Sequence, residues 1–595
     1  MAGHNGGGRT KMSRSTRAGN RAPHRVTILA AMIAAVVGSN AHAFKINTSS
    51  SDWDLNWDNT VTYNLGVRAR GIDPMIGNNP NFDDGDYKFR HAGDVVTNRV
   101  AMVSEFTAAY KGYMGFKLSG SAWKDFAYGS GDVTNPGVFA PAGGGLPAVT
   151  YRSLAAYPNG HYGSFTNRYY VQGAQLLDGF AFYNTEIGGK AVYLKAGQFT
   201  EYWGNSLLFP FSGISVAQGA LDSIKGLNSP GTQTKELLLP RPQISMTAQI
   251  TPELSLSGQY ALGWTYNRLA TGGTYLQAND AIAQGPSGLL ATTLPGAAVG
   301  HPGGFVPVFV PQGASNTPPQ IDNNFGVKLG WTPSFFTGQM GFYYRRFDES
   351  QPWVLTNWSR GLPTDYHLAY NRGAQLLGYS LDTTIGNVAA GFELSWRHNT
   401  ALNTALSSNI ARQTEGAKGD VLNLIANAIV PLSSSPLWQT GSLVAELSYS
   451  HLLSVTENAS IYNGVGYRGC PSNNKWNGCS TKDYVGAGFV FTPQWLQVLP
   501  GVDLSMPTSM TVGLYGNNPQ NPGSSAAGQG FFTYSVGLQA LVRQKASVTL
   551  AYNGYHAHVN TRSVTPSGLP YASGGNGLFD LNDRPWISLT VQSWF

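Results

Sequence analysis

Residues 99–128 read RVAMVSEFTAAYKGYMGFKLSGSAWKDFAY, and this stretch decides the fold class. Apolar and polar side chains alternate on both sides of Lys111-Gly112, where the chain reverses direction. The apolar face of the first half carries Met102, Phe106, Ala108 and Tyr110, with Ser104 among them; in the second half Met114, Phe116, Leu118, Gly120 and Ala122 alternate with Gly115, Lys117, Ser119, Ser121 and Trp123. A period of two with one apolar and one polar face predicts a β-hairpin.

Segments with the same alternation recur along the chain, and several come as pairs joined by very short turns. They are 53–69, 180–187, 191–199, 243–250, 254–264, 325–331, 339–347, 387–397, 442–451, 484–491, 510–515, 533–542 and 546–555. Stretches rich in Gly, Pro, Asn and Ser separate them at 129–163, 270–320, 403–419 and 517–530. Short turns at one end and long loops at the other are typical of an all-β, transmembrane, antiparallel outer-membrane barrel.

The composition fits such a barrel. The chain has 12% charged residues, 42% hydrophobic residues and a mean hydropathy of −0.17. Low charge suits strands that alternate a lipid-facing apolar side chain with a small or polar lumen-facing one. No segment after the leader is apolar for long enough to form a spanning helix. The alternative at this point is an ordinary secreted sandwich.

The C-terminal residues carry the most specific local signal. Ile587, Leu589 and Val591 alternate with Ser588, Thr590 and Gln592, and the sequence ends in Ser593-Trp594-Phe595. This resembles the terminal strand that the barrel-assembly machinery recognises, with Phe595 as the terminal aromatic residue. Ser593 departs from that pattern, because an aromatic residue is common there. The alternative is an edge strand of a soluble protein.

The N-terminal residues have the three parts of a secretory signal peptide, which we place at 1–43. A basic stretch without Asp or Glu precedes an apolar run at 26–37 and the small-x-small site Ala41-His42-Ala43, so Phe44 should begin the mature protein. The apolar run is too short to cross the roughly 30 Å hydrocarbon core as a helix. Six of the 38 basic residues lie in this leader, and the remaining 32 equal the 32 acidic residues. A net charge of zero offers no general attraction for nucleic acid.

Chain length limits the size of the barrel. With strands of about ten residues, the mature chain accommodates roughly 14 to 18 strands, and a single bacterial chain should have an even number. We expect a number near 16, in one domain over 44–595. The oligomeric state is left open between monomer and trimer.

The two cysteines lie in one turn-rich stretch, Gly469-Cys470-Pro471 to Gly478-Cys479. In the oxidising cell envelope they should form a disulfide that closes a long loop. The alternative is metal binding, which needs more donors at ligand spacing than this loop offers.

Two stretches differ from generic barrel sequence and resemble a known family. The first stretch begins at 81–86 with Asp83, Asp84 and Asp86, and continues with Asn98-Arg99 and Ser104-Glu105. The second begins at 197–206 with Gln198, Glu201, Trp203 and Gly204. It continues with Leu221-Asp222, Pro230-Gly231 and the run from Lys235-Glu236 to Pro240. Together they resemble the proteobacterial outer-membrane family DUF1302 over most of the mature chain. Gln218 to Asp222 departs from the Asn-Pro-x-Asp step expected there. The resemblance implies an envelope barrel suspected of moving hydrophobic or amphipathic small molecules, and it leaves the cargo open.

The second stretch, 199–240, is too rich in Pro, Gly and polar residues to be lipid-facing strand throughout. Backbone that cannot be paired against lipid must lie in the lumen or in water. We therefore expect this segment to fold into the lumen and narrow the pore. The residues expected at the constriction are Glu201, Trp203, Asp222, Lys235 and Glu236. The alternative is an external loop.

Asp83-Asp84-Gly85-Asp86 clusters carboxylates around a Gly turn, as calcium loops do. It lacks the distal bidentate Glu of an EF-hand loop, so we interpret it as an acidic surface turn and assign no metal ligand.

The sequence favours a channel over an enzyme. No Gly-x-Ser-x-Gly segment or phosphate-cradling loop is present, so we assign neither catalytic residues nor a cofactor. The expected partners are outer-membrane lipids, the barrel-assembly machinery and a small hydrophobic cargo, without nucleic acid. The competing class is a non-enzymatic outer-membrane scaffold or docking component of an export assembly. A barrel hydrolase is a third class.

Overall fold

The computed structural model describes residues 44–46, 50–129, 134–281, 283–406, 411–520 and 528–595. The predicted signal peptide, 1–43, lies outside these residues. Within them, no helix is both long and apolar enough to cross a bilayer.

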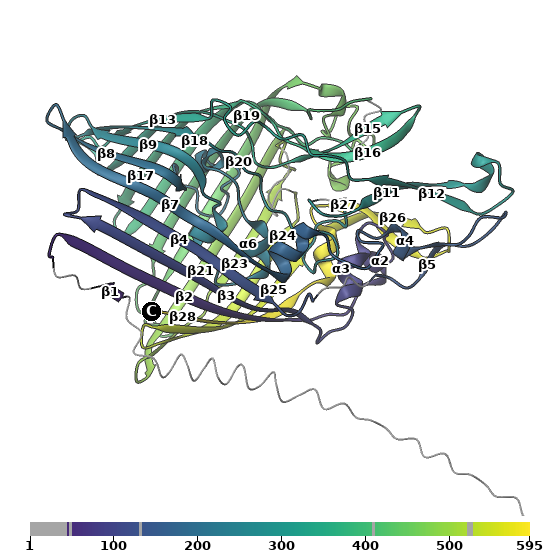
Figure 1. Ribbon diagram of the computed structural model, residues 1–595, viewed down its shortest axis with the longest axis horizontal. Helices are drawn as coiled ribbons and strands as arrows, with labels where there is room; N and C mark the ends of the chain where they lie inside the picture. The colour runs from purple at the N-terminus through teal and green to yellow at the C-terminus, as the bar shows by residue number, and fades with distance from the viewer. Residues whose placement is uncertain (1–43, 47–49, 130–133, 282, 407–410, 521–527) are drawn as a thin grey trace, which may run out of the picture. The chain divides into compact units, whose positions relative to one another are not determined.

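Most of the chain forms one antiparallel sheet that closes on itself (Figure 1). Its first strands are β2 (Trp53–Arg68), β3 (Val95–Tyr110), β4 (Met114–Asp125), β7 (Gln172–Ile187), β8 (Lys190–Phe199), β9 (Arg241–Gln249), β10 (Leu254–Ala261), β13 (Phe325–Trp331) and β14 (Gly338–Phe347). The ring continues through β17 (Ala374–Ile385), β18 (Val388–Ala401), β19 (Lys418–Pro431), β20 (Thr440–Glu457), β21 (Asp483–Leu499), β22 (Val502–Ser505), β23 (Thr508–Tyr515), β24 (Phe532–Val542), β25 (Ala546–His556) and β28 (Trp586–Trp594).

The described residues make a barrel of eighteen strands, because β22 and β23 form one interrupted strand between β21 and β24. The short strand β1 (Phe44–Ile46) adds to β2 beyond the end of β28. The expectation of an even number between 14 and 18 is confirmed, and the narrower expectation near 16 is wrong.

The ring closes between β2 and β28. Thr60 lies opposite Trp594 and Arg68 lies opposite Trp586. Beyond this ladder the terminal Phe595 exchanges two backbone hydrogen bonds with Asn59, with N···O distances of 2.7 and 2.9 Å. The predicted terminal strand therefore leaves no free edge at this seam.

The outer face is apolar across successive strands. Leu256, Leu329, Phe342, Tyr379, Leu394, Leu424 and Tyr449 lie opposite one another in that order from β10 to β20. The predicted hairpin is confirmed as β3 and β4, and its outward Met102, Phe116 and Leu118 are 40 to 50% exposed. A closed antiparallel barrel with an apolar exterior is the architecture of outer-membrane proteins. The protein is such a transmembrane barrel.

Short turns and long loops lie at opposite ends of the barrel. The turns at 111–113, 188–189 and 386–387 lie at the end where β1 and the C-terminus lie (Figure 1). The long loops form four hairpins: β5 (Val138–Ala140) with β6 (Val149–Thr150), β11 (Gly288–Pro295) with β12 (Phe305–Pro311), β15 (Trp353–Ser359) with β16 (Leu362–Ala369), and β26 (His558–Val564) with β27 (Pro570–Asn576).

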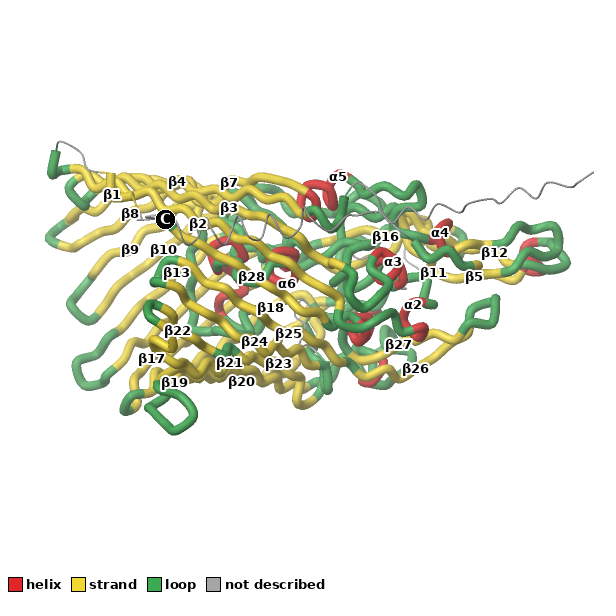
Figure 2. Tube along the Cα trace, turned by 90° about the horizontal axis from the view of Figure 1, so that it is seen from below, coloured by secondary structure: helices red, strands yellow, loops and turns green. Residues whose placement is uncertain are grey.

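Short helical segments lie in two places. The long-loop end holds α2 (Pro74–Gly77), α3 (Asp83–Lys88), α4 (Tyr151–Leu154) and α5 (Ser164–Thr166), whereas α6 (Ser223–Asn228) lies among the barrel strands in both views (Figures 1 and 2). The others are α7 (Thr234–Leu237), η1 (Asn167–Val171), η2 (Ile214–Gln218), η3 (Gly296–Val299), η4 (Ala459–Ile461), η5 (Lys475–Asn477) and η6 (Phe579–Asp583).

The sequence did not predict β17 and β19, in each of which an apolar residue faces the lumen next to an apolar residue that faces outward. Leu377 of β17 faces outward and is 50% exposed, while its neighbour Leu376 is fully buried on the lumen side. In β19, Ile425 is likewise fully buried on the lumen side, next to the outward Leu424. An inward apolar side chain removes the alternation by which a barrel strand is detected.

A buried ion cluster joins three of the long loops. Arg68 contacts Asp86 at 2.9 Å and Asp583 at 3.2 Å, and Arg584 contacts Asp86 at 3.2 Å. All four side chains are fully buried. Arg584 also donates to the carbonyl of Tyr275, at 3.1 Å. The loops at 69–94, 262–324 and 557–585 therefore share one set of charges.

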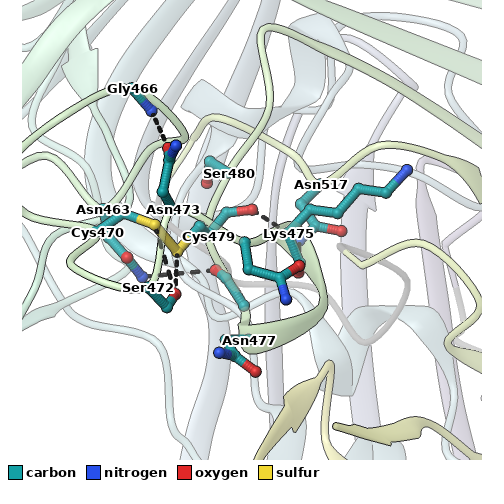
Figure 3. Close-up of a disulfide and its surroundings, with 12 residues drawn as sticks. Asn463, Gly466, Cys470, Ser472, Asn473, Lys475, Asn477, Cys479, Ser480 and Asn517 are labelled. Carbon is teal, nitrogen blue, oxygen red and sulfur yellow. Dashed lines mark hydrogen bonds between the residues drawn. A yellow bond between two sulfur atoms is a disulfide. The ribbon is translucent and has the colours of Figure 1, made fainter.

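The predicted disulfide is confirmed. Cys470 and Cys479 are bonded in the loop between β20 and β21 (Figure 3). Asn517, from the loop between β23 and β24, donates to the Cys479 carbonyl at 2.8 Å and to the Lys475 carbonyl at 2.7 Å. The disulfide thus fixes the backbone that a neighbouring loop binds.

Replacing both cysteines by Ser should loosen this loop without opening the barrel. For so short a closed loop, the chain-entropy relation gives a loss of about 2.5 kcal/mol. Trypsin should then cleave at Lys475 faster than in the oxidised protein, while the barrel keeps its heat-modifiable migration in SDS gels. Equal cleavage rates in the two proteins would contradict a structural role for the disulfide.

Arg584→Met should release the three loops, because it leaves Asp86 and Asp583 buried with one cation fewer. Removing one partner of a buried ion pair typically costs about 3 to 5 kcal/mol. Hydrogen exchange at 82–89 and 275–281 should accelerate by roughly a hundredfold or more. Arg562→Met is the control, because Arg562 is exposed on β26, and protection equal to wild type in Arg584→Met would refute the role.

Candidate functional site

The connection between β8 and β9, residues 200–240, runs inside the barrel. It contains η2, α6 and α7, and it contacts inward-facing side chains on strands from several parts of the ring. Figure 1 shows α6 among the strands rather than with the external loops. We call residues 200–240 the lumen segment.

Two carboxylates of the barrel wall hold the backbone of the lumen segment. Glu446 of β20 accepts hydrogen bonds from the amides of Leu207 (2.5 Å), Phe209 (2.7 Å) and Leu208 (3.1 Å), and from the Ser206 hydroxyl (2.9 Å). Glu393 of β18 accepts from the amides of Asn205, Ser206 (3.0 Å) and Ile214 (2.6 Å). Bonds from N–H groups to an ionised acceptor are stronger than neutral ones and compensate a buried carboxylate.

Gly204 is required where the lumen segment meets Glu393. Its φ is +109°, and a Cβ placed there would lie 2.6 Å from the Glu393 carboxylate. A residue with a side chain would be strained in the backbone and would also displace the carboxylate.

Apolar contacts anchor the same part of the lumen segment. Trp203 and Ile214 join a buried cluster with Tyr343 of β14 and Leu376 of β17. Phe209 packs on Ile425 of β19. These contacts explain why β17 and β19 carry apolar residues toward the lumen.

Two buried arginines also reach the lumen segment. Arg345 of β14 and Arg241 of β9 both donate to the carbonyl of Ala217, at 3.0 and 3.3 Å. The Arg345 guanidinium lies 4.9 Å from the centre of the Trp203 ring, in cation–π geometry.

The second half of the lumen segment is held by ion pairs. Asp222 caps α6 by accepting from the Lys225 amide at 3.0 Å, and its other oxygen contacts Arg268 at 2.8 Å. The Lys225 ammonium contacts Glu236 at 2.7 Å and donates to Ser121 of β4 at 3.0 Å. Asp222, Lys225 and Glu236 are all buried.

The segment then reaches the seam of the barrel. Gln592 of β28 donates to the Gly231 carbonyl at 2.7 Å, and Thr590 donates to the Pro230 carbonyl at 3.4 Å. Gln233 donates to Thr60 of β2 at 3.0 Å. Because other contacts fall on β14 to β20, the lumen segment crosses from one side of the ring to the other.

A partly solvated charge ladder lies beside the segment. Glu105 of β3 contacts Lys117 of β4 at 2.7 Å and also pairs with Lys235 of the lumen segment. Lys117 approaches Asp178 of β7 at 3.5 Å. The side chains of Lys117 and Lys235 are 28 and 30% exposed, so this ladder meets solvent within the barrel.

The residues predicted at a constriction have two kinds of surroundings. Trp203, Asp222 and Glu236 are buried in contacts that hold the lumen segment. Lys235 belongs to the charge ladder, and Glu201 is partly buried and accepts from Ser245 at 3.3 Å. A role at the pore surface stays a prediction for all five.

The other motif residues lie at contacts between the barrel and its inserted parts. Arg99 is buried with its guanidinium 5.1 Å from the Trp123 ring centre, and Gln198 donates to the Leu177 carbonyl at 2.7 Å. Pro240 ends the lumen segment directly before β9.

Sequence reasoning missed Glu393, Glu446, Arg241, Arg345 and Lys225. The signal for the first four was an ionisable residue at an inward position of a strand, where lipid-facing placement is excluded.

Comparison with solved structures finds weak likenesses. The outer membrane channel DcaP of Acinetobacter baumannii is 10% identical, with 93% of this chain and 100% of that chain covered and a TM-score of 0.34. OpdK of Pseudomonas aeruginosa, solved with vanillate, is 9% identical over 91% and 98% of the chains, with a TM-score of 0.36. OccAB1 of Acinetobacter baumannii is 8% identical over 93% and 99%, with a TM-score of 0.38. Likenesses at this level carry no argument about function.

The sequence profiles of protein families give a match over nearly the whole chain. No curated protein matches. Residues 25–595 match the family described as "Protein of unknown function (DUF1302)", as the motifs at 81–105 and 197–240 predicted. The chain belongs to the DUF1302 family.

Proposed function

We propose that the protein is an outer-membrane channel that passes small polar or amphipathic molecules beside the lumen segment. The observation that supports this proposal is the charge ladder of Glu105, Lys117, Asp178 and Lys235, which keeps solvent contact inside a closed barrel. Ionisable side chains in a barrel line the water-filled part of the lumen.

A neutral polar wall provides the second boundary of the proposed passage. The inward faces of β23, β24 and β25 carry partly exposed hydroxyl and amide groups. Thr511 and Thr533 are hydrogen-bonded to each other at 2.9 Å, and Gln539 donates to Thr549 at 3.0 Å. The anchoring contacts of the lumen segment fall on other strands, so we place the passage between the segment and this wall.

The polarity of the two walls indicates which cargo the proposed passage suits. One side offers paired charges of both signs and the other offers neutral hydrogen-bonding groups, which suits solutes with a polar part. Trp353 of the external loops offers no exposed aromatic surface to a hydrophobic cargo, because it is buried and donates to the Leu402 carbonyl at 2.9 Å. We therefore favour polar or amphipathic molecules. An outer-membrane scaffold remains the second class, distinguished by its lack of conductance.

Replacing residues 205–236 by a short Gly-Ser turn should widen the passage. Because the lumen segment crosses the barrel, its removal should raise single-channel conductance several-fold in planar bilayers. Shortening the tip of the β26–β27 hairpin is the control, because that hairpin belongs to the external loops. Unchanged conductance and ion selectivity would refute the constriction, and no conductance in either protein would favour the scaffold.

Glu446→Gln tests the anchor with a change of one atom. The amide keeps one acceptor oxygen but loses the charge that four donors of the lumen segment and Asn427 share, and each charge-assisted bond is worth roughly 1.5 to 3 kcal/mol. The segment should fluctuate, so the open-channel current should become noisier and the mean conductance should rise.

Glu457→Gln is the matched control, since Glu457 lies at the exposed end of the same strand β20. Current traces of Glu446→Gln that cannot be distinguished from those of Glu457→Gln would rule out the anchoring role of Glu446.

A further inference from the structure

Three aspartate carboxylates from two distant loops meet at the long-loop end of the barrel. Asp83 and Asp84 belong to α3, and Asp280 lies in the loop between β10 and β13. One oxygen of each lies within 4.8 Å of the others. The three residues are 2, 0 and 3% exposed, so the interpretation of 83–86 as an acidic surface turn is wrong.

The spacing suits one hard cation. Calcium binds oxygen ligands at about 2.3 to 2.6 Å, so two ligands on opposite sides of the ion are separated by at most about 5 Å. The three oxygens fall within that limit. All are hard oxygen donors, which favours Ca²⁺ or Mg²⁺ over metals that prefer nitrogen or sulfur.

Gln277 provides a second, independent indication of a ligand. Its side chain is fully buried, and its Nε2 donates to the Asp280 carboxylate. Its Oε1 atom is buried without a hydrogen-bond partner among the described residues. A buried carbonyl oxygen with no donor is costly, and calcium sites commonly use such amide oxygens.

Gly85 permits the two loops to approach this closely. A Cβ at Gly85 would lie 2.3 Å from the Thr274 carbonyl oxygen and 3.1 Å from Gln277 Oε1. The Gln277 oxygen therefore lies against Gly85, in the helix that carries Asp83 and Asp84, while the Nε2 atom of the same amide reaches Asp280.

Two arginines near the carboxylates belong to the adjoining ion cluster. Arg68 and Arg584 contact Asp86 and Asp583 in the adjoining ion cluster.

We propose that Asp83, Asp84, Asp280 and Gln277 bind one calcium ion that joins the loop at 69–94 to the loop at 262–324. Calcium is favoured over magnesium because these ligands form a protein cage, whereas Mg²⁺ usually keeps several of its own waters. The site departs from the sequence interpretation, which assigned no metal ligand. It is independent of the proposed channel function.

The full-length protein, folded in detergent and stripped with EGTA, should bind one Ca²⁺ per chain in isothermal titration. Magnesium should bind at least tenfold more weakly. Hydrogen exchange at 81–89 and 272–281 should slow by tenfold or more when Ca²⁺ is added. Absence of both heat and added protection in the wild-type protein would overturn the proposal, whether or not the protein conducts in bilayers.

Asp280→Asn keeps the shape of the side chain and removes one charged ligand, so calcium affinity should fall more than tenfold. Asp94→Asn is the matched control, since Asp94 belongs to the same 69–94 loop and its side chain is 38% exposed. If Asp280→Asn does not fold, Gln277→Met carries the same expectation of weaker binding. Wild-type affinity in the folded variant would overturn the assignment.

Discussion

In a bilayer every backbone N–H and C=O must be paired within the protein, and the rest of this structure depends on that constraint. The seam between β2 and β28, extended by the two bonds between Asn59 and Phe595, completes the pairing around the ring. Once the ring is closed, irregular backbone is excluded from the lipid side. The long connections therefore form external loops, except for the lumen segment, which lies against the inner wall.

The backbone amides of the lumen segment also need hydrogen-bond acceptors, and these must be found inside the barrel. Glu393 and Glu446 meet this need by accepting from the five consecutive amides of Asn205 to Phe209 and from the amide of Ile214. The arrangement works in both directions: the amides compensate two buried carboxylates, and the carboxylates satisfy amides that a helix or strand would otherwise pair. Gly204 allows the approach because it adds no Cβ next to Glu393.

The contacts between the lumen segment and the barrel wall also explain which parts of the structure could be predicted from the sequence. The β3–β4 hairpin and the terminal strand could be predicted because their outward and inward faces differ in polarity. Leu376 and Ile425 remove that difference in β17 and β19, since each packs against the lumen segment. The entry of 199–240 into the lumen was expected from its composition. The residues that anchor this segment could not be predicted, because Glu393 and Glu446 lie about 190 and 240 residues away from the groups they bind. The acidic turn at 83–86 was misread for a related reason: Asp280 and Arg584, which bury it, are remote in sequence.

The Glu393 and Glu446 carboxylates in the lumen and the ion cluster at the long-loop end differ in the groups that neutralise their charges, and this difference separates their roles. In the lumen, Glu393 and Glu446 meet backbone amides of a single segment, so their loss should affect that segment. At the long-loop end, carboxylates meet arginines from β2 and from the loop at 557–585, and Arg584 also donates to backbone carbonyls of the loop at 262–324. The loop at 262–324 joins β10 to β13. Six strands, β2 to β9 of the ring, lie between β10 and the β2–β28 seam. Charges at this end therefore connect loops from different parts of the ring, whereas Glu393 and Glu446 set the position of one element inside it. Conductance and loop order should consequently respond to different residues.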